Sequence, residues 1–169
     1  FDDFKILRPS DNDLQAQENF LDNISSTYYG SIPLTQVEDI LASATVYNNG
    51  GTEQTGVVLH TDILTSSGDL VFSSTSDAIS IGVAETDTLI LAETFVPTET
   101  GSYEATYFVD QDQDEATPSD NRLESIPFNV TDTVFSRAMY YTSTYGAANA
   151  GGEGVEFAAN YKVINDGMI

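Results

Sequence analysis

GSYEATYFVD, residues 101–110, alternates between two kinds of side chain. One set is apolar or aromatic: Tyr103, Ala105, Tyr107 and Val109. The other set is polar: Glu104, Thr106 and Asp110. Because successive side chains of a β-strand point to opposite faces, this stretch predicts a strand with one buried face and one face toward solvent.

Similar runs of Val, Ile, Thr, Tyr and Phe recur roughly every 10–15 residues, separated by Gly, Asn, Asp, Ser or Pro. We therefore expect short strands at residues 40–47, 55–64, 69–73, 78–83, 86–95, 101–110 and 122–131. Residues 14–21 and 27–34 are weaker candidates. This spacing is typical of all-β proteins and predicts an antiparallel β-sandwich of about seven strands with extra flanking strands.

Two glycine-containing turns are expected between these strands. Residues 48–51 (NNGG) tolerate a positive φ angle, which the tight turns of hairpins require. Residues 66–68 (SSG) predict a second turn. Pro127 has no backbone N–H, so we expect it at a sheet edge or at a β-bulge.

The composition changes on both sides of the predicted sandwich. Residues 1–36 are polar and form an N-terminal flanking segment, whereas residues 37–133 form the sandwich. Residues 134–169 contain the small-residue stretch GAANAGGEG (residues 146–154), followed by an apolar run. This C-terminal segment is too short to close a core of its own. We expect it to begin a truncated following β domain or to supply an exchanged strand.

The chain is strongly anionic, with 27 Asp and Glu against five Lys and Arg and a formal charge of −22. Such a surface repels phosphates, so neither nucleic acid nor anionic lipid is an expected partner. The absence of cysteine excludes disulfides, zinc–thiolate sites and thiol catalysis. It also favours an exported bacterial protein over a small secreted eukaryotic domain. No apolar run is long enough for a transmembrane helix, and a start at Phe1 without Met indicates a processed chain or an excised fragment.

Residues 101–105 (GSYEA) resemble the immunoglobulin-type corner, in which a Gly precedes a Tyr that lies two residues ahead of a cysteine. Ala105 occupies the cysteine position, and Ala42 or Ala44 would face it, so small side chains replace the disulfide. The tryptophan of antibody domains is also missing. The resemblance implies an immunoglobulin-like sandwich that is not of the antibody type.

Two further segments are similar to the bacterial cell-adhesion-related domain (CARDB), a seven-stranded immunoglobulin-like module. Residues 44–51 (ATVYNNGG) match its strand–Asn-Asn-Gly–strand run, and residues 101–121 match its Gly-x-Tyr strand, acidic loop and Asn-terminated turn. Residues 28–36 (YYGSIPLTQ) and 145–157 (YGAANAGGEGVEF) look like segments that flank such domains in large secreted proteins of Bacteroidota. The resemblance implies export through the type IX secretion system and a role as a spacer or adhesive unit.

The stretch VDQDQDEATPSDN (residues 109–121) is the main candidate for a metal site. Its acidic residues are Asp110, Asp112, Asp114, Glu115 and Asp120. An EF-hand loop needs Gly at its sixth position and Glu at its twelfth, but counting from Asp110 these positions hold Glu115 and Asn121. An EF-hand is therefore excluded, although carboxylates this close repel one another unless a cation or water screens them. Two interpretations stay open: a calcium site of another type, or a solvated hairpin loop with no cofactor.

Nothing in the sequence predicts catalysis. The single histidine, His60, shares a predicted strand face with Asp62, but no serine lies in the Gly-x-Ser-x-Gly setting of a hydrolase triad. We interpret His60 as a surface or groove histidine. The tyrosines of residues 28–29 and 140–145 could stack on sugar rings, although Tyr is also common in strands.

We therefore expect a non-enzymatic structural or adhesive module of a secreted, cell-surface bacterial protein. Its partners would be further copies of itself, joined through edge strands, or neighbouring domains of the same polypeptide. The alternative is a carbohydrate-binding accessory domain of a secreted hydrolase, with polysaccharide as its ligand.

Overall fold

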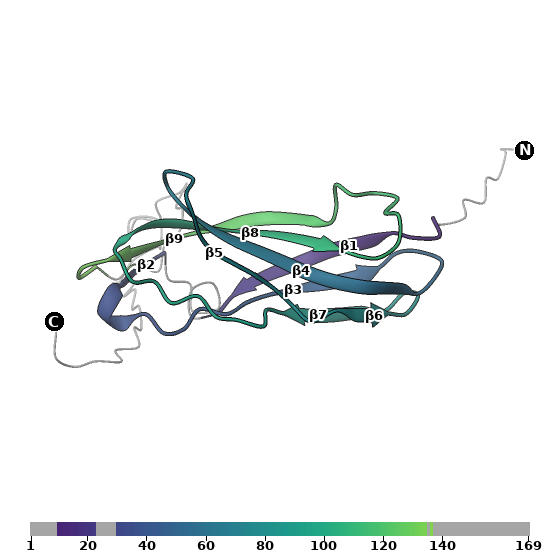
Figure 1. Ribbon diagram of the computed structural model, residues 1–169, viewed down its shortest axis with the longest axis horizontal. Helices are drawn as coiled ribbons and strands as arrows, with labels where there is room; N and C mark the ends of the chain where they lie inside the picture. The colour runs from purple at the N-terminus through teal and green to yellow at the C-terminus, as the bar shows by residue number, and fades with distance from the viewer. Residues whose placement is uncertain (1–9, 23–29, 135, 137–169) are drawn as a thin grey trace, which may run out of the picture.

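In the computed structural model, which describes residues 10–22, 30–134 and 136, the chain forms two stacked sheets (Figure 1). The strands are β1 (Leu14–Leu21), β2 (Ser31–Pro33), β3 (Ala42–Asn48), β4 (Gln54–Thr65), β5 (Leu70–Thr75), β6 (Ile79–Ile81), β7 (Thr86–Ile90), β8 (Gly101–Asp110) and β9 (Arg122–Thr131). One sheet has the order β1-β3-β7 and the other the order β2-β9-β8-β4-β5, with β6 paired to β4. Within these ranges the only helix is the single turn η1 (Leu34–Gln36).

The prediction of an all-β antiparallel sandwich is confirmed. Strands β1, β8 and β9 begin and end at the predicted residues. The predicted strand at residues 86–95 is shorter, because β7 ends at Ile90 and only isolated bridges follow at Leu91 and Phe95. Among the described strands, one pair departs from the antiparallel pattern: β2 runs parallel to β9.

Strands β1 and β2 belong to the two sheets although they lie in the predicted flanking segment. β1 pairs along its length with β3, from Leu14 opposite Asn48 to Leu21 opposite Ala42. β2 pairs with the last three residues of β9 and leaves the other side of Pro127 open, as expected of a proline at a sheet edge. The N-terminal part of the chain thus contributes one strand to each sheet.

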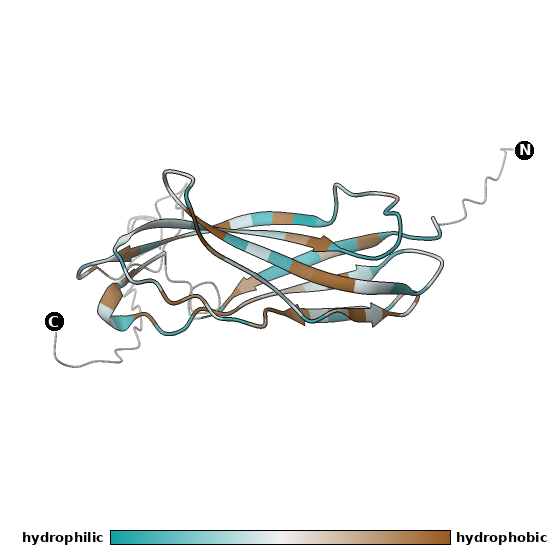
Figure 2. Cartoon of the chain, in the orientation of Figure 1, coloured by the Kyte–Doolittle hydropathy of each residue, from teal (hydrophilic) through white to brown (hydrophobic). Residues whose placement is uncertain are grey.

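The core lies between the sheets and follows the period-two pattern (Figure 2). The inward side chains of β8 are all buried: Tyr103, Ala105, Tyr107 and Val109. So are Ala42, Ala44 and Val46 of β3 and Val57, Leu59 and Ile63 of β4. The three alanines predicted to replace a disulfide therefore lie in the core, where small side chains let the sheets pack closely.

An aromatic cluster closes one end of the sandwich. The Tyr103 ring stacks on the Phe128 ring with 5.4 Å between the ring centroids. Phe95 lies edge-on to Tyr103 at a centroid distance of 5.7 Å and contacts Phe72 at a centroid distance of 5.6 Å. The Tyr103 hydroxyl donates a 2.8 Å hydrogen bond to the carbonyl of Glu99, four residues upstream. This bond is the tyrosine corner of immunoglobulin-like folds, so the resemblance seen at residues 101–105 is confirmed. We call this region the aromatic end.

The turn at residues 48–51 does not depend on positive φ angles at its glycines, although the sequence had suggested this. Positive φ angles occur at Gly56 and Gly68 among the described glycines, but not at Gly50 or Gly51. A Cβ atom on Gly50 would instead lie 2.7 Å from the carbonyl oxygen of Asp11 and 2.9 Å from the backbone nitrogen of Asp13. Gly50 is therefore needed because the chain before β1 passes directly against this turn.

Candidate functional site

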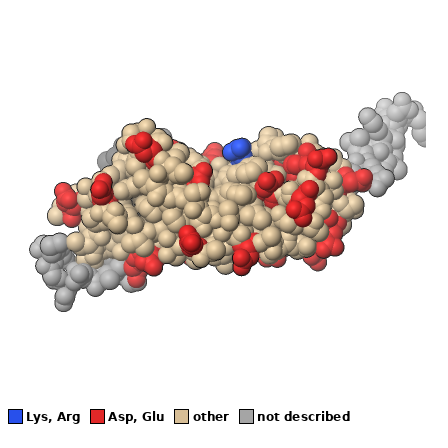
Figure 3. Space-filling model, in the orientation of Figure 1, with Lys and Arg blue, Asp and Glu red and all other residues tan. Residues whose placement is uncertain are grey.

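The acidic β8–β9 loop lies at the other end of the sandwich, beside the β3–β4 turn and the segment that leads into β1 (Figure 1). Backbone hydrogen bonds join these parts: Asn49 N donates to Asp13 O at 2.9 Å, and Ala16 N donates to Asp120 O at 3.0 Å. We call residues 11–14, 48–54 and 111–121 together the loop end. Acidic side chains gather there in the view of Figure 3.

Glu115 is the centre of the loop end. Its carboxylate accepts hydrogen bonds from the backbone N–H of Leu14 at 3.1 Å, from Gln111 Nε2 at 2.8 Å and from Asn121 Nδ2 at 3.1 Å. A carboxylate can take this many donors because both of its oxygens only accept. Glu115 therefore fastens the β8–β9 loop to the start of β1.

The other predicted metal ligands do not share one position. Asp110, Asp112 and Asp114 are exposed; Asp110 accepts a bond from the next backbone N–H, and Asp112 accepts one from the hydroxyl of Thr55. Asp120 is half-buried. Burial raises the pKa of its carboxyl group, and the nearby charges of Asp13 and Glu115 raise it further.

Within the described ranges, no three Asp, Glu or His side chains are grouped so that they could hold a metal ion by themselves. A calcium site made of the five predicted carboxylates stays a prediction.

The sequence reasoning missed Asp13, which the structure places in the loop end. Asp13 is only 7% exposed, and its Oδ2 accepts a 2.6 Å bond from Asn49 Nδ2. Asn48 is fully buried and donates to the carbonyl of Ile81 at 2.9 Å. The available signal was an Asp directly before an apolar strand residue, which is too common to single out.

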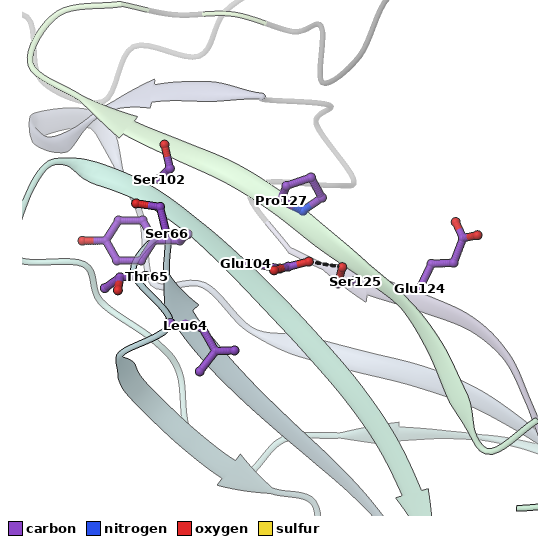
Figure 4. A pocket seen from close by; sticks show the side chains of 10 residues that line it. Leu64, Thr65, Ser66, Ser102, Glu104, Glu124, Ser125 and Pro127 are labelled. Carbon is purple, nitrogen blue, oxygen red and sulfur yellow. Dashed lines mark hydrogen bonds between the residues drawn. The ribbon is translucent and has the colours of Figure 1, made fainter. Parts of the chain in front are cut away.

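The outer face of the larger sheet carries two open hollows. The larger, of about 630 Å³, lies beside the β4–β5 turn and is shown in Figure 4. Two of its serine hydroxyl groups are engaged: Ser125 donates to Glu104, and Ser102 donates to Asn129 Oδ1 at 2.6 Å. The lining contains no histidine that could activate these serines.

His60 lies in the smaller hollow, of about 340 Å³. It is opposite Phe108 across β4 and β8, and Phe108 is opposite Arg122 across β8 and β9. The guanidinium carbon of Arg122 lies 4.6 Å from the centre of the Phe108 ring, a cation–π contact. The hydroxyl of Thr106 donates to the carbonyl of Asp62. His60 is thus a groove histidine with no serine beside it in the lining.

Several predictions concern residues outside the described part of the chain. These are the sugar-stacking tyrosines at residues 28–29 and 140–145 and the small-residue stretch at residues 146–154. No helix among the described residues has the length and apolarity needed to cross a membrane.

No protein-family model and no curated protein matches the sequence. Solved structures do match. One match is the crystal structure of the CARDB domain of the PF1109 protein from Pyrococcus furiosus in complex with di-metal ions. The two sequences are 19% identical, and the alignment covers 78% of this chain and 98% of that chain with a TM-score of 0.51. Its solution NMR structure is 18% identical, with 73% and 99% covered and a TM-score of 0.51.

A family 123 glycoside hydrolase from Clostridium perfringens is 12% identical, with 72% of this chain but 28% of that chain covered, at a TM-score of 0.48. Identities this low establish a likeness of fold. The chain has the CARDB-like, immunoglobulin-like sandwich that its motifs implied.

Proposed function

We propose that the chain is a non-enzymatic structural and adhesive module of an exported bacterial surface protein, and that copies associate through the edge of β5. The CARDB-like fold supports a module of this class by analogy. The resemblance of residues 28–36 and 145–157 to segments of secreted Bacteroidota proteins supports export from such a cell through the type IX system. The observation that carries the proposal is the chemistry of the β5 edge.

β5 is the last strand of its sheet, and its sequence LVFSST contains neither a charged residue nor a proline. Leu70 and Val71 are 58% and 45% exposed. On the side away from β4, the described backbone bond to β5 comes at its end, from Ala92 N to Thr75 O. Edge strands usually carry charges or prolines that prevent pairing with another chain. This edge lacks both and is suited to accept a strand from a second copy.

The other described edges are less suited to pairing. β6 is only three residues long, which limits pairing with another chain. β7 contains Asp87, a charge that opposes pairing. β1 is linked to the opposite sheet by a 2.6 Å bond from Asn19 Nδ2 to the Glu124 carbonyl. The outer side of β2 is occupied by the bridge between Ser31 and Ser136. On a chain with a charge of −22, an uncharged edge is also where two copies repel each other least.

Light scattering over a concentration series tests the proposal. We expect the mass of the wild-type chain to rise with concentration and that of Val71→Lys to stay monomeric. The lysine reduces the net negative charge, so a loss of association would reflect the blocked edge and not charge repulsion. Val83→Lys is the matched control, because Val83 is 52% exposed but lies outside β5. Identical behaviour of the two variants, or a monomeric wild type throughout, would contradict the proposal.

On the outer face of the larger sheet, Arg122 lies over the Phe108 ring, which leaves that face of the ring unavailable for stacking on a sugar. This bears on the carbohydrate-binding alternative. Its predicted tyrosines lie outside the described residues. It stays a prediction that glycan binding, if observed, is lost in Tyr28→Ala or Tyr140→Ala.

A further inference from the structure

Besides Gln54 Oε1 in β4, four side-chain oxygens of the loop end are buried and have no hydrogen-bond partner. They are Asp13 Oδ1, Gln111 Oε1, Asp120 Oδ1 and Asn121 Oδ1. Asp13 and Asn121 are only 7% and 3% exposed as whole residues. A buried acceptor without a donor costs about 1–3 kcal/mol, and more when it is charged. Five such oxygens at one end of a small domain call for hydrogen-bond donors or a cation.

The two amide oxygens belong to side chains that meet at one carboxylate. Gln111 Nε2 and Asn121 Nδ2 both donate to Oε2 of Glu115, at 2.8 Å and 3.1 Å. These bonds fix the orientation of both amides, because a flipped amide would place its oxygen against the carboxylate oxygen. The amide oxygens are therefore held beside Glu115 with no donor of their own.

The two carboxylates come from both sheets to the same place. Asp13 precedes Leu14, whose N–H donates to Glu115 at 3.1 Å. Asp120 precedes Asn121 and lies close enough to Asp13 and Glu115 for both charges to raise its pKa. The charges of Asp13 and Glu115 thus both act on the Asp120 carboxylate.

No basic side chain of the described residues neutralises this cluster. Arg122 is the only Lys or Arg in those ranges, the blue group of Figure 3, and it lies over Phe108 on the outer face of the sheet. The oxygen-only donor set suits a hard divalent cation. Magnesium demands near-ideal octahedral geometry and keeps most of its water, whereas calcium accepts mixed carboxylate and amide oxygens from flexible loops.

We propose that Asp13 Oδ1, Gln111 Oε1, Asp120 Oδ1 and Asn121 Oδ1 hold one calcium ion at the loop end. Glu115 positions the two amides, and water completes the coordination shell. This site uses Asp13, which lies far from the acidic loop in sequence, and omits Asp110, Asp112 and Asp114. Calcium here clamps the start of β1, in one sheet, to the β8–β9 loop of the other. The site is independent of association through β5.

Thermal unfolding and calorimetric titration of the whole chain test the site. After removal of metal with a chelator, calcium should raise Tm saturably, and magnesium at the same concentration should raise it much less. Asp13→Asn should weaken calcium binding at least about tenfold, since affinity depends on the number of charged ligands. The matched control, Asp114→Asn, removes the same charge from an exposed position of the loop and should change the affinity less than about twofold.

If Asp13→Asn fails to fold, a second variant, Asp120→Asn, tests the same site. This variant should raise Tm in chelator, because it removes the repulsion from Asp13 and Glu115, and yet bind calcium more weakly than the wild type. Equal Tm shifts with calcium and magnesium, or equal effects of Asp13→Asn and Asp114→Asn, would mean diffuse screening and overturn the proposal. The proposal would also be overturned if calcium left the Tm unchanged and Asp13→Asn were more stable than the wild type. That result would mean that the Asp13 and Asp120 carboxylates share a proton where we place the metal.

Discussion

The two ends of the sandwich are closed by different kinds of interaction. At the aromatic end, Phe95, Tyr103 and Phe128 pack ring against ring, and the Tyr103 hydroxyl donates to the carbonyl of Glu99. At the loop end, the contacts are hydrogen bonds to Glu115, and five buried oxygens have no hydrogen-bond partner. Ring packing needs only matching shapes, whereas buried oxygens need donors or a cation. The aromatic end is therefore self-sufficient, and the loop end responds to its surroundings.

The largest effect is expected at the aromatic end. Phe128 is 1% exposed, so Phe128→Ala leaves a cavity and should lower the free energy of unfolding by about 3–5 kcal/mol. Urea denaturation measures the change, which should be the same with chelator and with calcium. Ile90→Ala, at a side chain 53% exposed, should stay within about 0.5 kcal/mol of wild type. A similar loss in both variants would mean that the aromatic cluster does not close this end.

Glu115→Gln should produce the largest effect at the loop end. The new amide keeps one acceptor oxygen and places its NH2 group either against the donors of Gln111 and Asn121 or against those of Leu14 and Thr117, which should lower the free energy of unfolding by about 1–3 kcal/mol in chelator. Asp114→Asn serves as the exposed control and should change it by less than about 0.5 kcal/mol. If the two variants were equally stable, Glu115 would not be the link between the loop and β1.

Tyr103→Phe isolates the polar bond of the aromatic end. It keeps the ring and removes the hydroxyl that bonds to Glu99, so the free energy of unfolding should fall by about 0.5–1.5 kcal/mol. The same urea experiment measures it. A fall as large as that of Phe128→Ala would assign the stability of this end to the hydrogen bond and not to the rings.

The smallest effect concerns pH at the loop end. The pKa of Asp120 is raised above its ordinary value of 3.8, so the folded state binds the proton more tightly than the unfolded state. The stability from this group is complete below that value and is lost as pH rises through the raised pKa. In chelator, Asp120→Asn should therefore gain stability relative to wild type as pH rises above 3.8, until the raised pKa is passed. A difference that stays constant with pH would show that Asp120 does not titrate differently on folding.

The aromatic end was the part that sequence reasoning predicted well. Alternation along β8 and the Gly-x-Tyr motif identified both the strand and the corner, because each depends on residues that are close in the chain. The loop end was predicted only in part. Asp13 and Glu115 are separated by most of the sandwich in sequence, and hydrogen bonds from Leu14 and Ala16 of β1 to the β8–β9 loop of the other sheet bring them together. Likewise, the need for Gly50 comes from the Asp11 backbone, which no turn rule contains.

The pairing of the first strands has a mechanical consequence. The described chain enters with β1 at the loop end and leaves with β9 at the aromatic end (Figure 1). Tension along the long axis therefore pulls β1 lengthwise against β3, and β2 lengthwise against its parallel neighbour β9. Strands loaded in shear must break several hydrogen bonds together, whereas a hairpin pulled open breaks them one at a time. We expect the sandwich to resist stretching between its ends far better than peeling of β5, and single-molecule pulling from the two attachment geometries would measure the ratio.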